Sequence, residues 1–135
     1  MNEKISAQKT AGAAFMAENS KREGVKELPG GIQYKIIKEG TGAQPQVTDS
    51  VKAHYKGSLL DGKEFDNSFK RGKPFSAPLR ALIKGWQVAL PQMKVGSHWR
   101  LWIPSDLAYG DRGAGSDIPG GATLIFEVEL LEIVK

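Results

Sequence analysis

The chain has 135 residues, of which 40% are hydrophobic and 25% are charged, and these values fit a single globular domain with one core. It has no cysteine, which excludes disulfides and thiolate metal sites, and its net charge of +4 is spread along the sequence, which argues against nucleic acid as a partner. No apolar run approaches the roughly 20 residues that a helix needs to cross a bilayer.

Residues 4–23 are predicted to form a helix, because alanine, lysine and glutamate are frequent in the segment and Gly24 is suited to end it. The apolar face of this helix is weak, since Ile5, Phe15 and Met16 are its only large hydrophobic residues. An isolated helix of this length is marginally stable in water. We therefore expect the segment either to dock on another surface or to be the end of a longer helix, and we favour the longer helix.

Residues 25–31 are predicted to be a linker with a Pro-Gly-Gly turn, and a β-rich domain follows at residues 32–135. Hydrophobic and polar residues alternate along residues 51–59, which is typical of a strand with one buried face. The alternation predicts that Tyr55 points inward and His54 outward.

The rest of the domain is predicted to consist of strands and turns with one helix. Asp61-Gly62 lies between apolar flanks and predicts a two-residue hairpin, and residues 67–74 are expected to be a polar loop. Ile83, Trp86 and Leu90 lie at helical spacing and predict a short helix over residues 81–90 with these residues on one face.

Further strands are predicted at residues 32–36, 64–66, 99–103 and 124–130. In the strand at 99–103, Trp99, Leu101 and Ile103 share the core face. In the last strand, every second residue from Leu124 to Leu130 points to the same side. The sum is an α+β fold of about five antiparallel strands with one short helix laid across them.

Two outward-facing features of the predicted strands have ordinary explanations. Trp102 falls on the outward face of its strand, where the N-terminal helix or a partner subunit could cover it. Both histidines, His54 and His98, also fall on outward faces and are expected to be exposed strand residues, since two histidines are too few for a metal site.

The long loop at residues 104–121 connects two core strands. A loop of this length in a compact domain is uncommon unless it lines or covers a site. We expect Tyr109 and Ile118 of this loop, with Phe126 of the following strand, to wall a small apolar pocket. The glycines of the loop do not form a dinucleotide-binding fingerprint, because they precede a strand and not a helix.

Two interpretations remain open for Asp66. It can be a solvated or paired surface carboxylate, or it can point inward, where Tyr55 or Arg71 would have to offset its desolvation. The aromatic residues are open in the same way, as plain core or as the wall of a pocket. Their positions at strand ends and in loops favour a pocket.

Several spaced motifs resemble one known family. They are HYKG and DGKEFDNS at residues 54–57 and 61–68, KGWQVALPQM at 84–93, LAYG at 107–110 and IPGGATLIFEVELLEI at 118–133. They are similar to the FKBP-type peptidyl-prolyl cis–trans isomerases over nearly the whole domain. The preceding residues resemble the bacterial branch that includes macrophage infectivity potentiator proteins. In that branch a long connecting helix joins the domain to an amino-terminal dimerisation region, so residues 1–24 are expected to be the end of that helix.

The resemblance implies a strongly bent antiparallel sheet wrapped around one short helix. It implies an enzyme that accelerates rotation about X–Pro bonds of protein substrates in an apolar pocket, without cofactor or metal, and so assists protein folding. The alternative is a proline-segment binding module or holdase chaperone with little turnover. The implied partners are proline-containing polypeptides, macrolide inhibitors and a second copy in a homodimer. The implied location is the periplasm, with the bacterial cytoplasm as the alternative.

The resemblance also implies site residues and their roles. The implied catalytic residues are Tyr55, Asp66, Tyr109 and Phe126, and the implied substrate-binding residues are Phe65, Phe75, Leu82, Ile83, Trp86 and Ile118. Trp86 would be the floor under the proline ring, and the Ile83 backbone N–H and the Tyr109 hydroxyl would bind substrate carbonyls. Arg71 would support Asp66. The chain departs from the family pattern at Ala77 and Asp117, where relatives have bulky or apolar residues.

Overall fold

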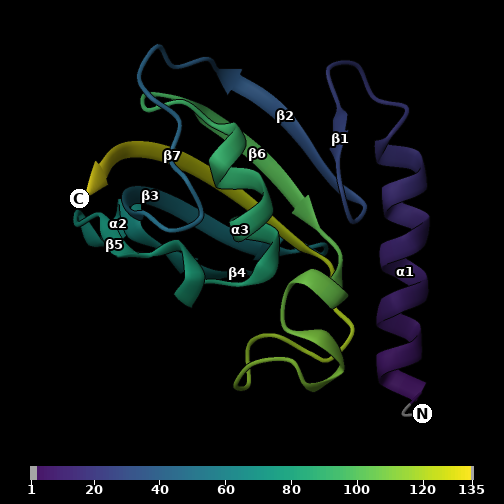
Figure 1. The fold of residues 1–135 in the computed structure, drawn as a ribbon. Coiled ribbons are helices and arrows are strands. Elements are labelled where there is room, and N and C mark those ends of the chain that lie inside the picture. Colours follow the sequence, from purple (N-terminus) through teal and green to yellow (C-terminus); the bar gives the residue numbers. More distant parts are fainter. Residues whose placement is uncertain (1–2, 135) are drawn as a thin grey trace.

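The structure, a computed structural model, describes residues 3–134 and consists of a strongly bent antiparallel sheet that wraps around a short helix, with a longer helix beside it (Figure 1). The described residues form seven strands: β1 (Lys26–Leu28), β2 (Ile32–Lys38), β3 (Ser50–Leu59), β4 (Glu64–Asn67), β5 (Phe75–Pro78), β6 (His98–Ile103) and β7 (Leu124–Val134). Residues 1, 2 and 135 of the expected domains lie outside the described residues.

The strand order is β1-β2-β6-β7-β3-β4, and β5 pairs with β3 as well. The α+β class and the bent sheet are therefore confirmed. The count of about five strands was too low, because β1 and β5 are short edge strands in which too few residues alternate to give a signal. β1 lies within the segment expected to be a linker and pairs with the start of β2.

The two central strands carry the core on alternate residues, as the period-two pattern predicted. In β6, the inward residues Trp99, Leu101 and Ile103 are buried, and β7 adds a second buried row. That row consists of Leu124, Phe126, Val128 and Leu130. The rows face the helix α3, so the core fills the space between α3 and the concave side of the sheet (Figure 1).

The helix α3 (Lys84–Ala89) is shorter than the predicted range of 81–90. Its flanks form 3₁₀ turns at residues 79–81 and 90–92, and the second turn contains Pro91. Trp86 and Leu90 are buried, as the helical spacing predicted. The helix thus presents an indole ring to the concave side of the sheet.

Two predicted turns are different in the structure. The hairpin between β3 and β4 has the four-residue loop 60–63, closed by a 2.9 Å bond from Leu59 N–H to Lys63 O, so the two-residue turn was wrong. Gly62 takes a φ of +90° there, a conformation that favours glycine. The expected polar loop at residues 67–74 contains the helix α2 (Ser68–Arg71), which Asn67 caps by accepting a bond from the Lys70 N–H.

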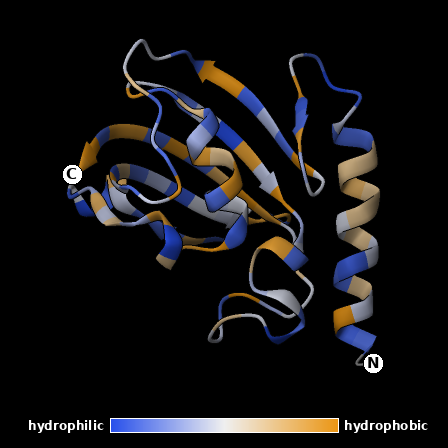
Figure 2. Ribbon diagram, viewed as in Figure 1, coloured by the Kyte–Doolittle hydropathy of each residue, from blue (hydrophilic) through white to orange (hydrophobic). Residues whose placement is uncertain are grey.

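The N-terminal helix α1 (Glu3–Asn19) ends earlier than predicted, in i→i+3 turns over residues 20–22. It docks on the domain: Asn19 Nδ2 donates to Gln33 Oε1 at 2.8 Å, and Gln33 Nε2 donates to the Met16 carbonyl at 2.9 Å. Figure 2 shows the mixed hydropathy of this helix, which has no continuous apolar stripe. Polar bonds and close backbone packing therefore hold a helix whose apolar face is weak.

No helix among residues 3–134 has the length and apolar character that a membrane span requires.

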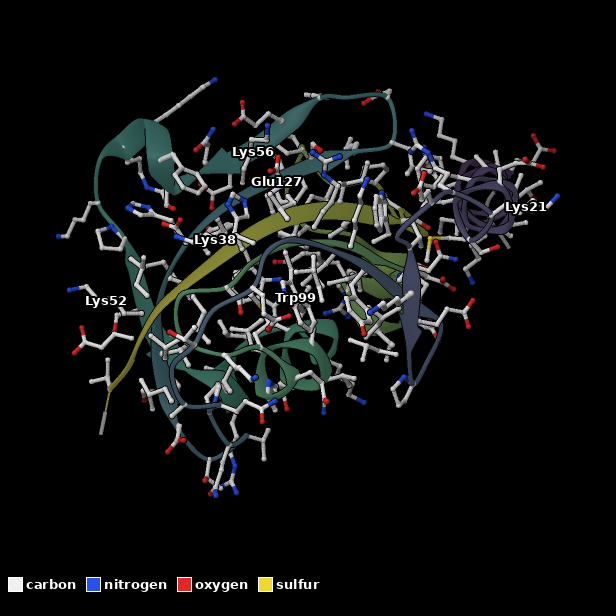
Figure 3. All side chains as sticks on the ribbon, turned by 90° about the horizontal axis from the view of Figure 1, so that it is seen from above. Lys21, Lys38, Lys52, Lys56, Trp99 and Glu127 are labelled. Carbon is white, nitrogen blue, oxygen red and sulfur yellow. The ribbon has the colours of Figure 1, made fainter. Side chains whose placement is uncertain are left out.

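The convex face of the sheet is polar but not fully exposed. Figure 3 shows Lys56 and Glu127 on one side of β7 and Trp99 on the other. The expectation of exposed histidines was wrong, because Phe69 of α2 stacks on His54 at 4.8 Å between ring centroids and also lies against His98.

Trp102 is on this same face, and it is only 3% exposed. It lines a hollow together with Phe15 of α1 and Arg22, so the N-terminal segment covers it. The sequence left two possibilities for what covers Trp102, the N-terminal helix or a partner subunit. The structure shows that the N-terminal segment of the same chain covers it.

Candidate active site

A cavity of about 420 Å³ opens beside α3 on the concave side of the sheet. All ten residues that were expected to contact substrate line it, and Ala81, Ala114 and Asp117 complete its lining. The ten are Tyr55, Phe65, Asp66, Phe75, Leu82, Ile83, Trp86, Tyr109, Ile118 and Phe126. Arg71 lies outside the lining, next to Asp66.

The fold brings these residues together from distant parts of the chain. Tyr55 lies on β3, Phe65 and Asp66 on β4, Phe75 on β5 and Phe126 on β7. Trp86 comes from α3, the segment before α3 adds residues 82 and 83, and the loop after β6 adds residues 109, 114, 117 and 118.

The floor and walls of the cavity are aromatic rings that meet edge to face. Trp86 is 4% exposed, and its ring centroid lies 5.2 Å from that of Tyr55 and 5.4 Å from that of Phe126, at interplanar angles of 86° and 88°. Phe65 meets Phe126 in the same way, at 5.8 Å and 87°. Such contacts are favourable and stabilise the ring positions, so the pocket is largely pre-formed.

Gly57 allows the two rings Phe65 and Phe126 to approach β3. A Cβ at this position would lie 2.6 Å from Phe65 Cζ and 2.9 Å from Phe126 Cε1, closer than real Cβ contacts. The backbone φ of Gly57 is not positive, so it is the space and not the conformation that requires glycine. The alternation along residues 51–59 puts Gly57 on the inward face with Tyr55, but hydropathy alone does not show that two rings approach it.

Asp66 belongs to a network with Tyr55 and Arg71 at one side of the cavity. The Tyr55 hydroxyl donates to Asp66 Oδ2, and the Arg71 guanidinium and the Asn67 N–H donate to Asp66 Oδ1. Partial burial acts to raise the pKa of Asp66, but these hydrogen bonds outweigh it and hold that pKa below its usual value. The structure agrees with the second interpretation of Asp66, because the residue lines the cavity and both Tyr55 and Arg71 donate hydrogen bonds to its carboxylate.

The same contacts act on Tyr55. Burial and the hydrogen bond to the Asp66 carboxylate raise the pKa of Tyr55 to about 12. The phenol is therefore a neutral donor at all physiological pH values, and the network fixes its ring against Trp86.

The indole N–H of Trp86 is buried and has no partner among residues 3–134. The two donors that were expected to bind substrate carbonyls, the Tyr109 hydroxyl and the Ile83 backbone N–H, belong to lining residues and also have no partner in that range. Tyr109 is 39% exposed, so its hydroxyl is accessible, and burial together with the charge of Asp66 raises its pKa. Both donors can therefore bind a carbonyl of an entering chain.

The loop that carries Tyr109 and Ile118 is internally bonded. Ala114 and Ile118 exchange two backbone hydrogen bonds of 2.9 and 3.1 Å, and the Gly121 N–H donates to Gly110 O at 2.9 Å. The loop thus has a defined shape. Sequence reasoning missed Ala114 as a lining residue, because an alanine in a glycine-rich loop gives no signal until this pairing is known.

The lining of the cavity is mostly apolar and aromatic. Its acidic groups are a paired carboxylate and Asp117, and no histidine, lysine or arginine lines it. Within residues 3–134, no group of three or more His, Cys, Asp or Glu side chains could hold a metal ion. The arrangement can enclose an apolar ring and bind carbonyls beside it.

The family model described as FKBP-type peptidyl-prolyl cis-trans isomerase matches residues 41–131, and the domain amino terminal to it matches residues 1–36. The chain therefore belongs to the FKBP-type peptidyl-prolyl cis–trans isomerase family, as the motifs indicated.

Two relatives and one solved structure show the branch. The chain is 48% identical over 132 residues to the FKBP-type 22 kDa peptidyl-prolyl cis-trans isomerase of Escherichia coli strain K12, covering 98% of this chain and 64% of the relative. It is 43% identical over 134 residues to the outer membrane protein MIP of Legionella longbeachae, covering 99% of this chain and 58% of the relative. It is similar to the crystal structure of FkpA from Escherichia coli, with a TM-score of 0.93, 40% identity and coverage of 97% and 61%. The chain spans less than two thirds of each of these proteins.

Proposed function

We propose that the chain accelerates cis–trans isomerisation of X–Pro bonds in polypeptides. The observation that carries this proposal is a pre-formed aromatic pocket whose lining residues include Tyr109 and Ile83, with a hydroxyl and a backbone N–H that have no partner between residues 3 and 134. A proline ring fits against the floor formed by Trp86, with Tyr55, Phe65 and Phe126 as walls.

The physical basis is the electronic change during rotation. The X–Pro bond has partial double-bond character and a barrier of about 18–20 kcal/mol, so uncatalysed exchange takes on the order of tens of seconds or more. At the twisted transition state the resonance between nitrogen and carbonyl is lost, and the carbonyl is less polar than in either planar isomer. An apolar pocket that excludes water therefore disfavours the planar states relative to the twisted one.

The donors hold the substrate during this rotation. The Ile83 N–H and the Tyr109 hydroxyl bind carbonyls on either side of the rotating bond, and the Asp66 network keeps Tyr55 in place as a wall. A 10⁴-fold acceleration needs only about 5.5 kcal/mol of differential binding. Shape complementarity, desolvation and two hydrogen bonds can supply this amount without an acid, base, nucleophile or metal.

The test is an isomerisation assay on a Leu-Pro peptide, followed by NMR exchange so that no coupling protease is required. Wild-type protein should accelerate exchange, and the Asp66→Leu variant should reduce kcat/KM while its circular dichroism spectrum stays that of the wild type. Measurable binding of the peptide with no acceleration would overturn the enzyme assignment and support the binding-module alternative. Neither binding nor acceleration would overturn both.

The partners and location follow from the family and are part of the same proposal. A macrolide should compete with the prolyl peptide, because the cavity of about 420 Å³ is a concave, aromatic site of the kind that binds small molecules. The full-length protein should form a homodimer through residues that lie outside this domain. The protein should act in the periplasm, with the bacterial cytoplasm as the alternative; the Legionella longbeachae relative is named an outer membrane protein.

A further inference from the structure

Asp117 is a carboxylate in the lining of the cavity whose charge is not neutralised by the protein. Its side chain is exposed, and it makes no hydrogen bond or ion pair with any residue between 3 and 134. The other lining carboxylate, Asp66, is paired with Arg71. The cavity therefore carries one available negative charge, although the chain as a whole is positive.

The position of Asp117 is fixed by the residue that follows it. Ile118 is 7% exposed, and both its N–H and its carbonyl are bonded to Ala114. A carboxylate on this ordered turn can hold a partner in one place, because the loop does not have to order when the partner arrives.

We infer that Asp117 gives the pocket a preference for prolyl segments that carry lysine or arginine next to the proline. This inference rests on the proposed function and names the substrate class of the same site. The pocket takes the proline ring, and the long side chain of a neighbouring basic residue reaches the rim, where it finds a carboxylate and no competing cation in the lining. An acidic neighbour meets the same carboxylate as a like charge and is disfavoured.

The size of the preference follows from the exposure of Asp117. Exposed ion pairs are weak, so a basic neighbour should gain a factor of about two to five in kcat/KM over leucine. An acidic neighbour should lose a similar factor. The ratio of basic to acidic peptide is then about 4 to 25 at low ionic strength, and it should shrink with added salt because the site is solvated.

The experiment compares peptides that differ only at the residue before or after the proline, with lysine, leucine or glutamate at that place. The wild-type ratio of kcat/KM for lysine over glutamate should exceed one at the position that faces Asp117. Asp117→Asn should bring this ratio towards one, and Asp117→Lys should reverse it. Asp106→Asn is the matched control, because it removes an exposed aspartate of the same loop that does not line the cavity, and it should keep the wild-type ratio.

The outcomes separate the inference from the proposed function. No acceleration of the leucine peptide defeats the proposed function, and the preference is then measured as the ratio of Kd values for the same peptides. A wild-type ratio of one at both positions, in rate or in binding, overturns the inference. A ratio that Asp106→Asn changes as much as Asp117→Asn does also overturns it, because the effect would then come from net charge.

Discussion

Replacing Gly57 with alanine should narrow the pocket without unfolding the domain. The new methyl group would lie 2.6 and 2.7 Å from two atoms of the Phe65 ring and 2.9 Å from Phe126. Carbon atoms in contact need about 3.5–4.0 Å, so the Phe65 ring must move by about 1 Å. Both rings line the cavity, so a shift of Phe65 into it reduces the volume that the proposed function assigns to substrate.

The expected magnitudes are different for stability and for activity. Overpacking of this size costs about 1–3 kcal/mol, and the loss of glycine from a strand returns about 0.5–1 kcal/mol of backbone entropy. The free energy of unfolding should therefore fall by at most about 2.5 kcal/mol. Displacement of substrate-positioning groups by about 1 Å can lower kcat/KM by up to about 100-fold.

Gly85→Ala is the matched control for this experiment. Its methyl group would lie 2.6 and 2.7 Å from side-chain atoms of Ile103, a fully buried residue outside the cavity lining. Urea unfolding should show a loss of stability in both variants, whereas the peptide exchange assay should show the large loss of kcat/KM only for Gly57→Ala. A wild-type kcat/KM in Gly57→Ala would refute the reasoning. It would also be refuted if Gly57→Ala and Gly85→Ala lost kcat/KM in the same proportion to their loss of stability.

Three further changes test the pocket walls and the Asp66 network. Tyr109→Phe should lower kcat/KM by about 2- to 10-fold and leave the urea midpoint unchanged, because the hydroxyl has no protein partner between residues 3 and 134 to lose; a shifted midpoint would contradict this. Phe126→Ala should cost about 3–5 kcal/mol of stability by urea unfolding and most of the activity, and a loss below about 1 kcal/mol would count against its buried position. The lowered pKa of Asp66 adds stability that is fully present above its unfolded pKa of about 3.9 and is lost as the pH falls through the lower folded value. The pH dependence of the urea midpoint below about pH 4 should therefore be shallower in Asp66→Leu than in wild type, and an identical slope would refute the pairing.

The sheet and its core could be predicted because burial alternates along β6 and β7 with the period of a strand. Trp99, Leu101 and Ile103 were assigned to the core from this pattern, and all three are buried. The elements that pattern reasoning missed are too short to have a period: α2 has one turn, and β1 and β5 have three and four residues. Their positions depend on caps and on pairing partners far along the chain.

The lining of the pocket was expected from the resemblance and from one physical argument, the length of the loop after β6. The roles given to individual lining residues stay predictions. What the sequence did not reveal is the effect of small residues: Gly57 lets two rings approach the strand, and Ala114 holds the turn beside Ile118. A contact made by the absence of a side chain, or by backbone atoms alone, has no signature in hydropathy.

The docking of α1 follows the same principle and explains how a helix with a weak apolar face packs on the domain. Gly12 has no side chain, and a Cβ there would overlap the hydroxyl of Thr123, so the helix backbone lies directly on the segment before β7. About one turn earlier, Lys9 Nζ is 2.6 Å from Asp111 Oδ1. About two turns earlier, the Ile5 carbonyl oxygen would be 2.7 Å from a Cβ on Gly121. These contacts reach the middle of the loop at Asp111 and its end at Gly121, so α1 lies against the loop that carries Tyr109 and Ile118. A helix can thus pack closely with little apolar surface when small residues let the two backbones meet. Hydropathy periodicity underestimates such packing, because it depends on side chains and does not register contacts between backbone atoms.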